Sequence, residues 1–211
     1  MPSQQTLASR LITVAGTTYA EEAGITIRNK PMALFELLSL CMLASKPIAA
    51  STAAAAAHEL FRDGLRTPIA VLAANRRQLI EAFGRAGYAR YDESSATRMT
   101  ELATKVKGEY GGDLRNLAAE ADHEVSATAE ALRDFTGIGQ VGADIFLREV
   151  QDVWPWVRTH FDDRAVATAK SLGLPDDPRR LGELAPQQST RLAAALVRAS
   201  FDDDVRERIG A

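Results

Sequence analysis

The stretch that decides the fold reads Leu132-Arg-Asp-Phe-Thr-Gly-Ile-Gly-Gln-Val-Gly-Ala-Asp-Ile-Phe-Leu-Arg-Glu149. It predicts a helix end, a tight turn at Thr136-Gly137-Ile138-Gly139 and a second helix that begins near Gln140. Glycine adopts backbone angles that are barred to other residues, so Gly137 and Gly139 allow a sharp turn and leave its N–H groups accessible. The first N–H groups of the second helix lack intrahelical acceptors and lie at the positive end of the helix dipole. The turn is therefore predicted to bind a phosphate, although Gly-x-Gly also occurs as a plain connector between helices.

A resemblance to a known family starts from this stretch. The pattern Leu132-x-x-Phe135-Thr-Gly137-Ile138-Gly139-x-x-x-Ala143 resembles the helix-hairpin-helix of the endonuclease III and 3-methyladenine DNA glycosylase II superfamily. Phe161-Asp162-Asp163-Arg164-Ala165-Val166 resembles the segment with its essential aspartate, and weaker similarity reaches back to about Asn29. The resemblance implies an all-α, two-lobed helical fold. A barrel lobe would occupy residues 30–140, the hairpin residues 132–149, and a second helical lobe residues 1–29 plus 150–211.

Two departures from the family pattern limit the chemistry that it implies. Bifunctional glycosylases place a lysine nucleophile on the second hairpin helix, and the corresponding residue here is Val141. The four-cysteine cluster of many endonuclease III proteins is absent, because Cys41 is the only cysteine. The resemblance therefore implies a monofunctional enzyme with no lyase activity and no iron–sulfur cluster. The 3-methyladenine branch often carries an aromatic residue where Val141 stands, so the base that is recognised stays open.

Asp163 is the candidate catalytic residue. As a base leaves its N-glycosidic bond, positive charge develops on the sugar, and a carboxylate can stabilise this charge and orient or deprotonate the attacking water. Asp162-Asp163 resembles the paired aspartates of the 3-methyladenine branch, in which the second is catalytic. We expect Asp162 to cap the helix that follows. The alternative is that both aspartates are only helix caps or first-turn acids.

The other candidate site residues form two groups. The DNA-binding candidates lie in the hairpin and are Thr136, Gly137, Ile138, Gly139, Gln140, Val141 and Gly142. The candidates for the base pocket or for the wedge that fills the duplex are Tyr88, Tyr91, Trp154, Trp156, Lys46 and His160. Enzymes that flip a base out of the duplex need such aromatic walls, although core packing is the alternative for each aromatic residue. For His160 the alternative is a structural or surface role.

No cofactor or catalytic metal is expected. No set of histidine, aspartate and glutamate residues has the spacing of metal ligands. The hairpin of the family often holds a structural monovalent cation through backbone carbonyls. The resemblance implies that these would come from residues near Arg133, Phe135 and Ile138.

The composition is that of an ordinary globular chain of 211 residues, 46% of them apolar. With 25 basic and 28 acidic residues the net charge is −3, which argues against a broad basic face for nucleic acid but allows phosphate binding by backbone amides. The N-terminus has no signal-peptide pattern, and Pro31–Ala44 is too short to span a bilayer. We expect a cytoplasmic, nucleoid-associated monomer that binds double-stranded DNA and no membrane.

Hydrophobic periodicity predicts roughly ten helices and no strands. They are expected to span residues 6–22, 31–44, 53–63, 68–74, 76–86, 94–109, 113–119, 126–135, 140–149, 164–172 and 187–200. Capping residues are expected at Ser51 or Thr52, at Thr67, at Asn75, at Ser94 or Ser95, and at Asp162. Pro175–Pro178 is expected to be a loop.

The sequence supports three functional hypotheses. The first is a monofunctional DNA glycosylase that removes a damaged or modified base during base excision repair. The second is a catalytically silent DNA-binding protein that keeps the hairpin, which the missing lysine and the acidic charge balance favour. The third is a helical module for protein–protein interaction.

Overall fold

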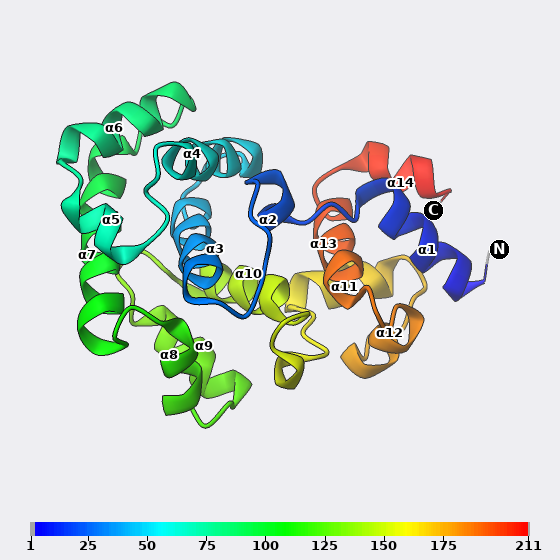
Figure 1. Cartoon of the computed structure of the whole chain (residues 1–211). Coiled ribbons are helices and arrows are strands. Elements are labelled where there is room, and N and C mark those ends of the chain that lie inside the picture. The colour runs from blue at the N-terminus through cyan, green and yellow to red at the C-terminus, as the bar shows by residue number, and fades with distance from the viewer. Residues whose placement is uncertain (1–2, 211) are drawn as a thin grey trace. The chain divides into compact units, whose positions relative to one another are not determined.

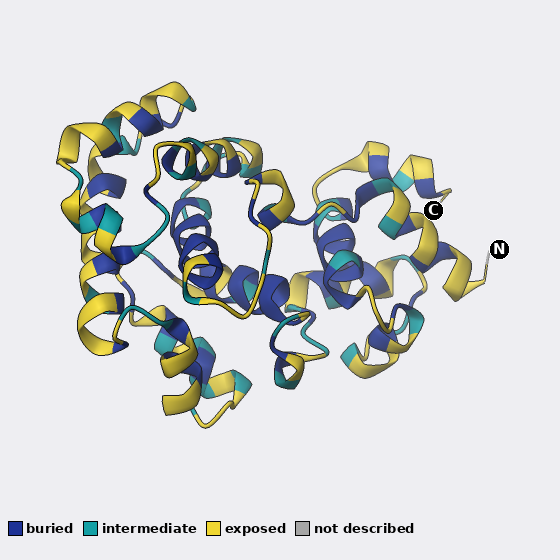
Figure 2. Cartoon of the chain, viewed as in Figure 1, coloured by how far each residue is buried: buried dark blue, intermediate teal, exposed yellow. Residues whose placement is uncertain are grey.

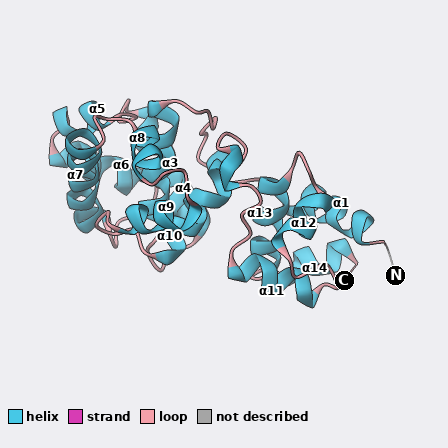
Figure 3. Ribbon diagram, turned by 90° about the horizontal axis from the view of Figure 1, so that it is seen from below, coloured by secondary structure: helices cyan, strands magenta, loops and turns pink. Residues whose placement is uncertain are grey.

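The structure is a computed structural model that describes residues 3–210 and is built from helices and connecting loops (Figure 3). No strand occurs in this part of the chain, so the predicted all-α class is confirmed. None of the helices within the same residues is long and apolar enough to cross a membrane. The finer expectation of a two-lobed glycosylase-like architecture stays a prediction.

The contacts within the chain define two compact units, which are labelled by their helices in Figure 1. Unit 1 contains the chain up to Thr18 and from Leu147 onward, and unit 2 contains Tyr19–Phe146. The lobes implied by the resemblance, residues 30–140 and 1–29 plus 150–211, remain a prediction. In this structure the contacts join residues 19–29 to unit 2, because Ala20, Ala23 and Ile25 are buried and α2 packs on α4.

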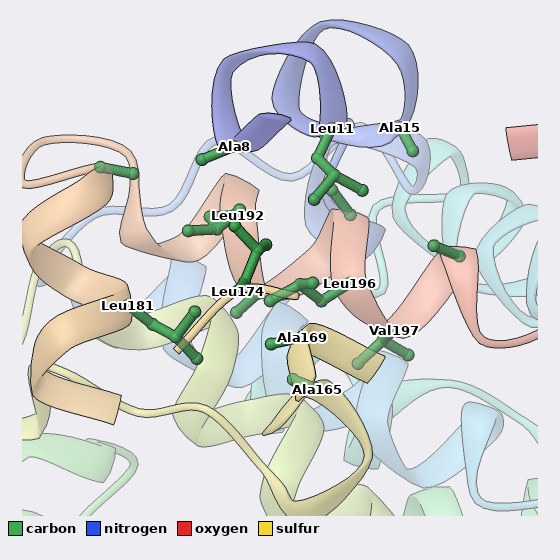
Figure 4. Packing of buried hydrophobic residues seen from close by; sticks show 14 of the residues in the cluster. Ala8, Leu11, Ala15, Ala165, Ala169, Leu174, Leu181, Leu192, Leu196 and Val197 are labelled. Atoms are coloured by element: carbon green, nitrogen blue, oxygen red, sulfur yellow. The ribbon is translucent and has the colours of Figure 1, made fainter. Parts of the chain in front are cut away.

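Unit 1 is organised around its longest C-terminal helix. Its elements are α1 (Gln4–Ala15), η1 (Pro155–Val157), α11 (Asp163–Ser171), α12 (Pro178–Leu184), α13 (Ser189–Ala199) and α14 (Asp203–Ile209), together with the end of α10 (Gln140–Val150). Helices α1, α11 and α14 all pack on α13. Leu192 and Leu196 of α13 are fully buried beside Leu11 of α1 in the same cluster, as Figure 4 shows. Each such leucine stabilises the fold by about 1.5–3 kcal/mol.

Unit 2 surrounds one helix that is buried on every side. Its helices are α2 (Tyr19–Glu22), α3 (Pro31–Ala44), α4 (Ala50–Arg62), α5 (Pro68–Ala73), α6 (Arg76–Arg85), α7 (Asp92–Glu109), α8 (Leu114–Glu120), α9 (Val125–Arg133) and the start of α10. Every residue of α3 from Ala33 to Leu43 is buried, which gives this helix its dark colour in Figure 2. The buried residues include Glu36, whose carboxylate pairs with Arg66. This confirms the prediction of a central apolar helix, against which α4, α7 and α8 pack.

Several capping residues were predictable from their side-chain chemistry. The side chains of Thr67, Asn75 and Asp162 accept hydrogen bonds from the N–H groups of Ala70, Gln78 and Ala165, at the starts of α5, α6 and α11. These bonds satisfy helix N–H groups that have no intrahelical acceptor, so three of the predicted caps are confirmed.

Other helix boundaries were predicted wrongly. Residues 6–22 are not one helix, because α1 ends at Ala15 and α2 begins at Tyr19. Gly16 closes α1 with its N–H donating to the Ile12 carbonyl, and the chain then passes from unit 1 to unit 2. Ser51 or Thr52 does not cap α4, which begins at Ala50 after Ala49 with no side-chain cap. The alanine-rich sequence has enough helix propensity to extend the helix past the expected start.

Three more helix starts differ from the prediction. Helix α7 begins at Asp92 instead of following Ser94 or Ser95, and the Ser95 N–H donates to the Tyr91 carbonyl. Helices α12 and α14 were missed. Each follows an aspartate cap, Asp177 or Asp202, that the pattern already contained, but these helices are only 7 residues long and too short for clear periodicity.

Candidate nucleic-acid interface

The hairpin turn has the conformation that its glycines predict. Gly137 has a φ of 92°, in the left-handed region that side chains disfavour. The turn is closed by the Ile138 N–H, which donates to the Phe135 carbonyl over 3.0 Å. Phe135 and Ile138 are buried, whereas Thr136 and Gly139 between and after them are exposed. The buried side chains of Phe135 and Ile138 therefore anchor the turn, and its polar backbone stays at the surface.

The start of α10 presents free backbone donors. The Gly139 carbonyl accepts the first hydrogen bond of this helix, from the Ala143 N–H over 3.0 Å, so Gly139 occupies the capping position. Glycine has no side chain with which to cap the helix. The N–H groups of Gln140, Val141 and Gly142 meet no acceptor among residues 3–210. They point out of the positive end of the helix dipole, which suits an anion.

Gly142 brings this helix close to the end of α3. A Cβ atom at Gly142 would lie 2.5 Å from the Ser45 Oγ and 3.4 Å from the Cys41 carbonyl oxygen. Only a residue without a side chain allows this approach. The contacts of Gly142 pack the hairpin on α3, and its expected role in binding DNA stays a prediction. The contact holds the donors of α10 beside the residues that follow α3.

A pocket of about 580 Å³ lies elsewhere on unit 2, along α7, whereas the hairpin lines a separate pocket of about 540 Å³. The hairpin pocket is lined by Ser45, Arg98, Arg133, Asp134, Phe135, Thr136, Gly137, Ile138, Gly139, Gln140 and Val141. The structure thus brings six of the seven predicted DNA-binding residues to one hollow. A pocket of that size that carries backbone donors and two arginines has room for a phosphate group.

Arg98 is a charged lining residue that sequence reasoning missed. It comes from α7, and a Cβ atom at Gly137 would lie 2.8 Å from its Cδ atom. The side chain therefore crosses the turn at the point where Gly137 leaves space. No motif links Arg98 to the hairpin, because 39 positions of chain separate them and the helix packing alone brings them together. The sequence of α7 by itself marks Arg98 only as one polar residue of a helix.

Two of the predicted pocket or wedge residues lie beside Arg98 in unit 2. The Lys46 ammonium is 5.5 Å from the centroid of the Tyr91 ring, and the Arg90 guanidinium carbon is 5.4 Å from it. Burial lowers the pKa of Lys46, and the positive charge of Arg98 lowers it further. Lys46 and Tyr91 thus form a cation–aromatic pair next to the hairpin, and their roles as wedge or pocket wall stay predictions.

Tyr88 has the contacts of a core residue. Its side chain is fully buried, and its hydroxyl donates to the Leu43 carbonyl over 2.9 Å. Burial raises the pKa of this hydroxyl. Its ring packs on Phe83 and Tyr91, with centroid distances of 5.5 and 6.2 Å. In this structure Tyr88 supports Tyr91 from within the core of unit 2 and lines neither pocket.

The paired aspartates divide two tasks at the start of α11 in unit 1. Asp162 caps the helix through its Oδ1, 2.9 Å from the Ala165 nitrogen, and its Oδ2 accepts from Arg148 over 2.7 Å. Asp163 is the first residue of the helix, is exposed, and forms no hydrogen bond or ion pair with any residue between 3 and 210. The expected capping role of Asp162 is confirmed. The catalytic role of Asp163 stays a prediction, and the exposed carboxylate is consistent with it.

The loop before α11 is held by Gln151 and an aromatic stack. Gln151 donates to the His160 carbonyl over 3.1 Å and accepts from the His160 N–H over 3.2 Å. Burial lowers the pKa of the His160 imidazole. Trp154, which is buried, and Trp156, which is half-buried, stack with ring centroids 5.2 Å apart. These contacts hold the loop that precedes Asp162, and the proposed pocket roles of its residues stay predictions.

Two further expectations concern metal ions: that the chain holds no catalytic metal, and that the hairpin holds a structural monovalent cation. Within residues 3–210 no group of three or more histidine, cysteine, aspartate or glutamate side chains is arranged to hold a metal ion. The implied monovalent cation at the hairpin stays a prediction. The Phe135 carbonyl accepts from Ile138, and its second lone pair leaves it able to bind a cation.

Comparisons with protein-family models, with curated proteins and with solved structures find no match to this chain.

Proposed function

We propose that this protein is a monofunctional DNA glycosylase, which hydrolyses the N-glycosidic bond of a damaged or modified base in double-stranded DNA. The observation that carries this proposal is the division of tasks between Asp162 and Asp163. The fold uses both oxygens of Asp162, and it leaves the adjacent carboxylate exposed at the start of α11. An exposed carboxylate that pairs with no described residue is free to meet a substrate, and the cap at Asp162 holds the backbone beside it.

The proposed role of Asp163 follows from the positive charge that develops on the sugar during the reaction. When the bond between the sugar and the base breaks, the electron pair leaves with the base and the sugar becomes an oxocarbenium-like cation. The carboxylate of Asp163 would stabilise that cation, and would accept a proton from the water that attacks the sugar. The products are the free base and an abasic site in an intact strand.

Strand cleavage is not part of this proposal. A lyase step needs an amine that forms a Schiff base with the sugar, and Val141 stands at the position where the resemblance would place one. The Val141 side chain is 63% exposed at the start of α10, beside the hairpin pocket. The backbone donors of Gln140 and Val141, which line that pocket, would instead bind a phosphate of the lesion strand.

The alternative is a catalytically silent DNA-binding protein that uses the hairpin alone. It is supported by the location of all the hairpin-pocket residues in unit 2, so that phosphate binding there does not require Asp163. The third hypothesis is a protein–protein interaction module. It does not explain the unpaired backbone N–H donors and the cations at the hairpin.

One experiment separates these alternatives. The full chain is incubated with duplexes that each carry one alkylated, deaminated or oxidised base, and the DNA is then treated with hot alkali, which breaks the strand at abasic sites. A glycosylase gives breaks with at least one lesion after alkali and none before it. Duplex binding without breaks on any lesion would support the silent DNA-binding protein, and absence of both would leave the interaction module.

A further inference from the structure

The hairpin pocket contains a cation that the hairpin itself does not supply. Arg98 reaches it from α7, and a Cβ atom at Gly137 would lie 3.2 Å from the Arg98 Nη1 and 3.4 Å from its Nε. The guanidinium therefore lies against the turn, where it also lines the pocket. Arg98 forms no hydrogen bond or ion pair with any residue between 3 and 210. Its five N–H donors have no protein acceptor, although the side chain is half-buried.

A second cation lies beside the first. Lys46, which is half-buried after the end of α3, has no acidic partner within the described chain. Lys46 directly follows Ser45, which lines the pocket. Burial lowers the pKa of Lys46, and the positive charge of nearby Arg98 lowers it further. Two positive charges that are partly removed from water and lack a carboxylate repel each other, and an anion between them would reverse this cost.

The remaining charged residues at the pocket do not neutralise this pair. Arg133 also lines the pocket and is directed to Gln140, whose Oε1 accepts from it over 3.0 Å, and to Glu130 at 4.0 Å. Asp134 is the acidic lining residue, and no ion pair joins it to Arg98 or Lys46 within the described residues. The pocket keeps an uncompensated positive charge although the chain as a whole is acidic, with a net charge of −3.

We propose that Arg98, assisted by Lys46, binds a backbone phosphate of the DNA at the hairpin pocket through its side chain. The planar guanidinium presents paired donors that match two phosphate oxygens, and it would act together with the N–H groups at the start of α10. The identification of the anion as a DNA phosphate rests on the proposed function. This assignment adds a charged, salt-sensitive contact from the Arg98 side chain of α7. The hairpin motif by itself predicts only neutral backbone N–H groups as phosphate donors at this site.

The test measures how duplex binding depends on salt. A short, fluorescein-labelled, undamaged duplex is titrated with the full chain at several KCl concentrations, and binding is followed by fluorescence anisotropy. The variants are Arg98→Gln, Arg98→Lys and Lys46→Gln. Arg77→Gln is the matched control, because Arg77 is an exposed arginine of unit 2 that pairs with Glu81 and lines neither pocket.

The proposal predicts a distinct pattern. Arg98→Gln should weaken binding by about tenfold at low salt, the loss expected for one charge-assisted hydrogen bond. The slope of log K against log salt should become shallower by about 0.9, the contribution of one phosphate contact. Arg98→Lys should recover the slope and only part of the affinity, since an ammonium keeps the charge but not the paired donors. Lys46→Gln should make the slope shallower, whereas Arg77→Gln should match the wild type.

Several results would overturn the proposal. One is an Arg98→Gln protein that melts like the wild type and keeps its affinity and slope, and another is an equal loss in Arg77→Gln. If inorganic phosphate at matched ionic strength displaces the duplex from Arg98→Gln as well as from the wild type, the anion at the pocket is not held by Arg98. Excision is measured separately, so Arg98-dependent binding without excision would sustain this inference while removing the proposed enzyme activity.

Discussion

Arg148 donates a hydrogen bond of 2.7 Å to the Oδ2 of Asp162, and the side chains of the two residues are only 3% and 8% exposed. The other oxygen of Asp162 accepts from the Ala165 N–H. One buried carboxylate therefore joins the end of α10 to the start of α11. The neighbouring Asp163 is placed by this junction, although it makes none of the contacts itself.

Arg148→Met tests this junction. The substitution leaves the buried carboxylate of Asp162 without its counterion, so we expect the free energy of unfolding to fall by about 3–5 kcal/mol. Urea denaturation followed by circular dichroism measures the change. Arg77→Met is the control, because Arg77 forms an exposed pair with Glu81 at 2.7 Å and should cost about 0–1 kcal/mol. Similar small losses in both variants would contradict a structural role for the buried pair.

A double substitution separates charge from capping. In Arg148→Met with Asp162→Ser, the serine retains a capping oxygen and removes the unpaired charge. We expect part of the stability lost in Arg148→Met to return. If the double variant is less stable than the single one, the carboxylate has a further task that the ion pair and the cap do not explain.

The pH dependence of stability should contain a contribution from His160. Burial lowers the pKa of this imidazole below its ordinary value of 6.5, and Arg148 lowers it further while the charge of Asp162 opposes the shift. The unfolded chain therefore takes up a proton at a higher pH than the folded chain does. The contribution of His160 to stability is complete above the unfolded pKa and declines as the pH falls from there towards the lower, folded pKa.

His160→Gln removes this titration. Chemical denaturation of both proteins between about pH 7.5 and about pH 5 should give a shallower loss of stability for the variant, since glutamine has no proton to take up in that range. Titrations of other groups are common to both proteins and cancel in the difference. Parallel curves for the two proteins would show that His160 titrates alike in the folded and unfolded states.

Gly142→Ala should damage the hairpin through packing. The new Cβ atom would lie 2.5 Å from the Ser45 Oγ and 3.0 Å from the Ile138 Cγ2, so either these side chains rotate or α10 shifts away from α3. We expect a loss of about 1–3 kcal/mol in thermal or urea unfolding, which is the usual cost of overpacking. We also expect weaker duplex binding in fluorescence anisotropy, because the donors of α10 move with the helix.

Gly84→Ala is the matched control for that substitution. Gly84 lies in α6, and a Cβ atom there would meet no atom within 4 Å. Alanine has the higher helix propensity, so this variant should be more stable by about 0.5–1 kcal/mol. If Gly142→Ala is also stabilised, the close approach of α10 to α3 is not a constraint in solution.

Local chemistry made part of this fold predictable. Thr67 and Asn75 could be recognised as caps because the bonds that they form lie within three residues of them, and Gly137 because its turn demands a positive φ. The buried helix α3 could be recognised because its apolar run is continuous. The break after Ala15 could not be recognised from the sequence. Helices α1 and α2 belong to different units, but the helical spacing of apolar residues continues across the boundary between them.

The candidate site was predicted less completely than the helices. The hairpin residues and the Asp162 cap follow from sequence-local motifs. Arg98 and Arg148 do not, because an arginine that crosses a turn or enters a core has the same sequence signature as a solvated one. Tyr88 was a pocket candidate because it is an aromatic residue in a connection; the structure buries it completely beside Phe83 and Leu43, and the pocket role stays a prediction.

The proposed excision of a base depends on the carboxylate of Asp163. Single-turnover excision should be measured with wild type and Asp163→Asn, on a lesion that the wild type removes and at protein concentrations that saturate the duplex. The asparagine has the same shape and no negative charge, so we predict a rate at least about 100-fold lower, a typical contribution of an acid–base group, with duplex affinity within about twofold of the wild type. Equal excision rates in the two proteins would contradict the assignment of Asp163 as the residue that stabilises the sugar cation.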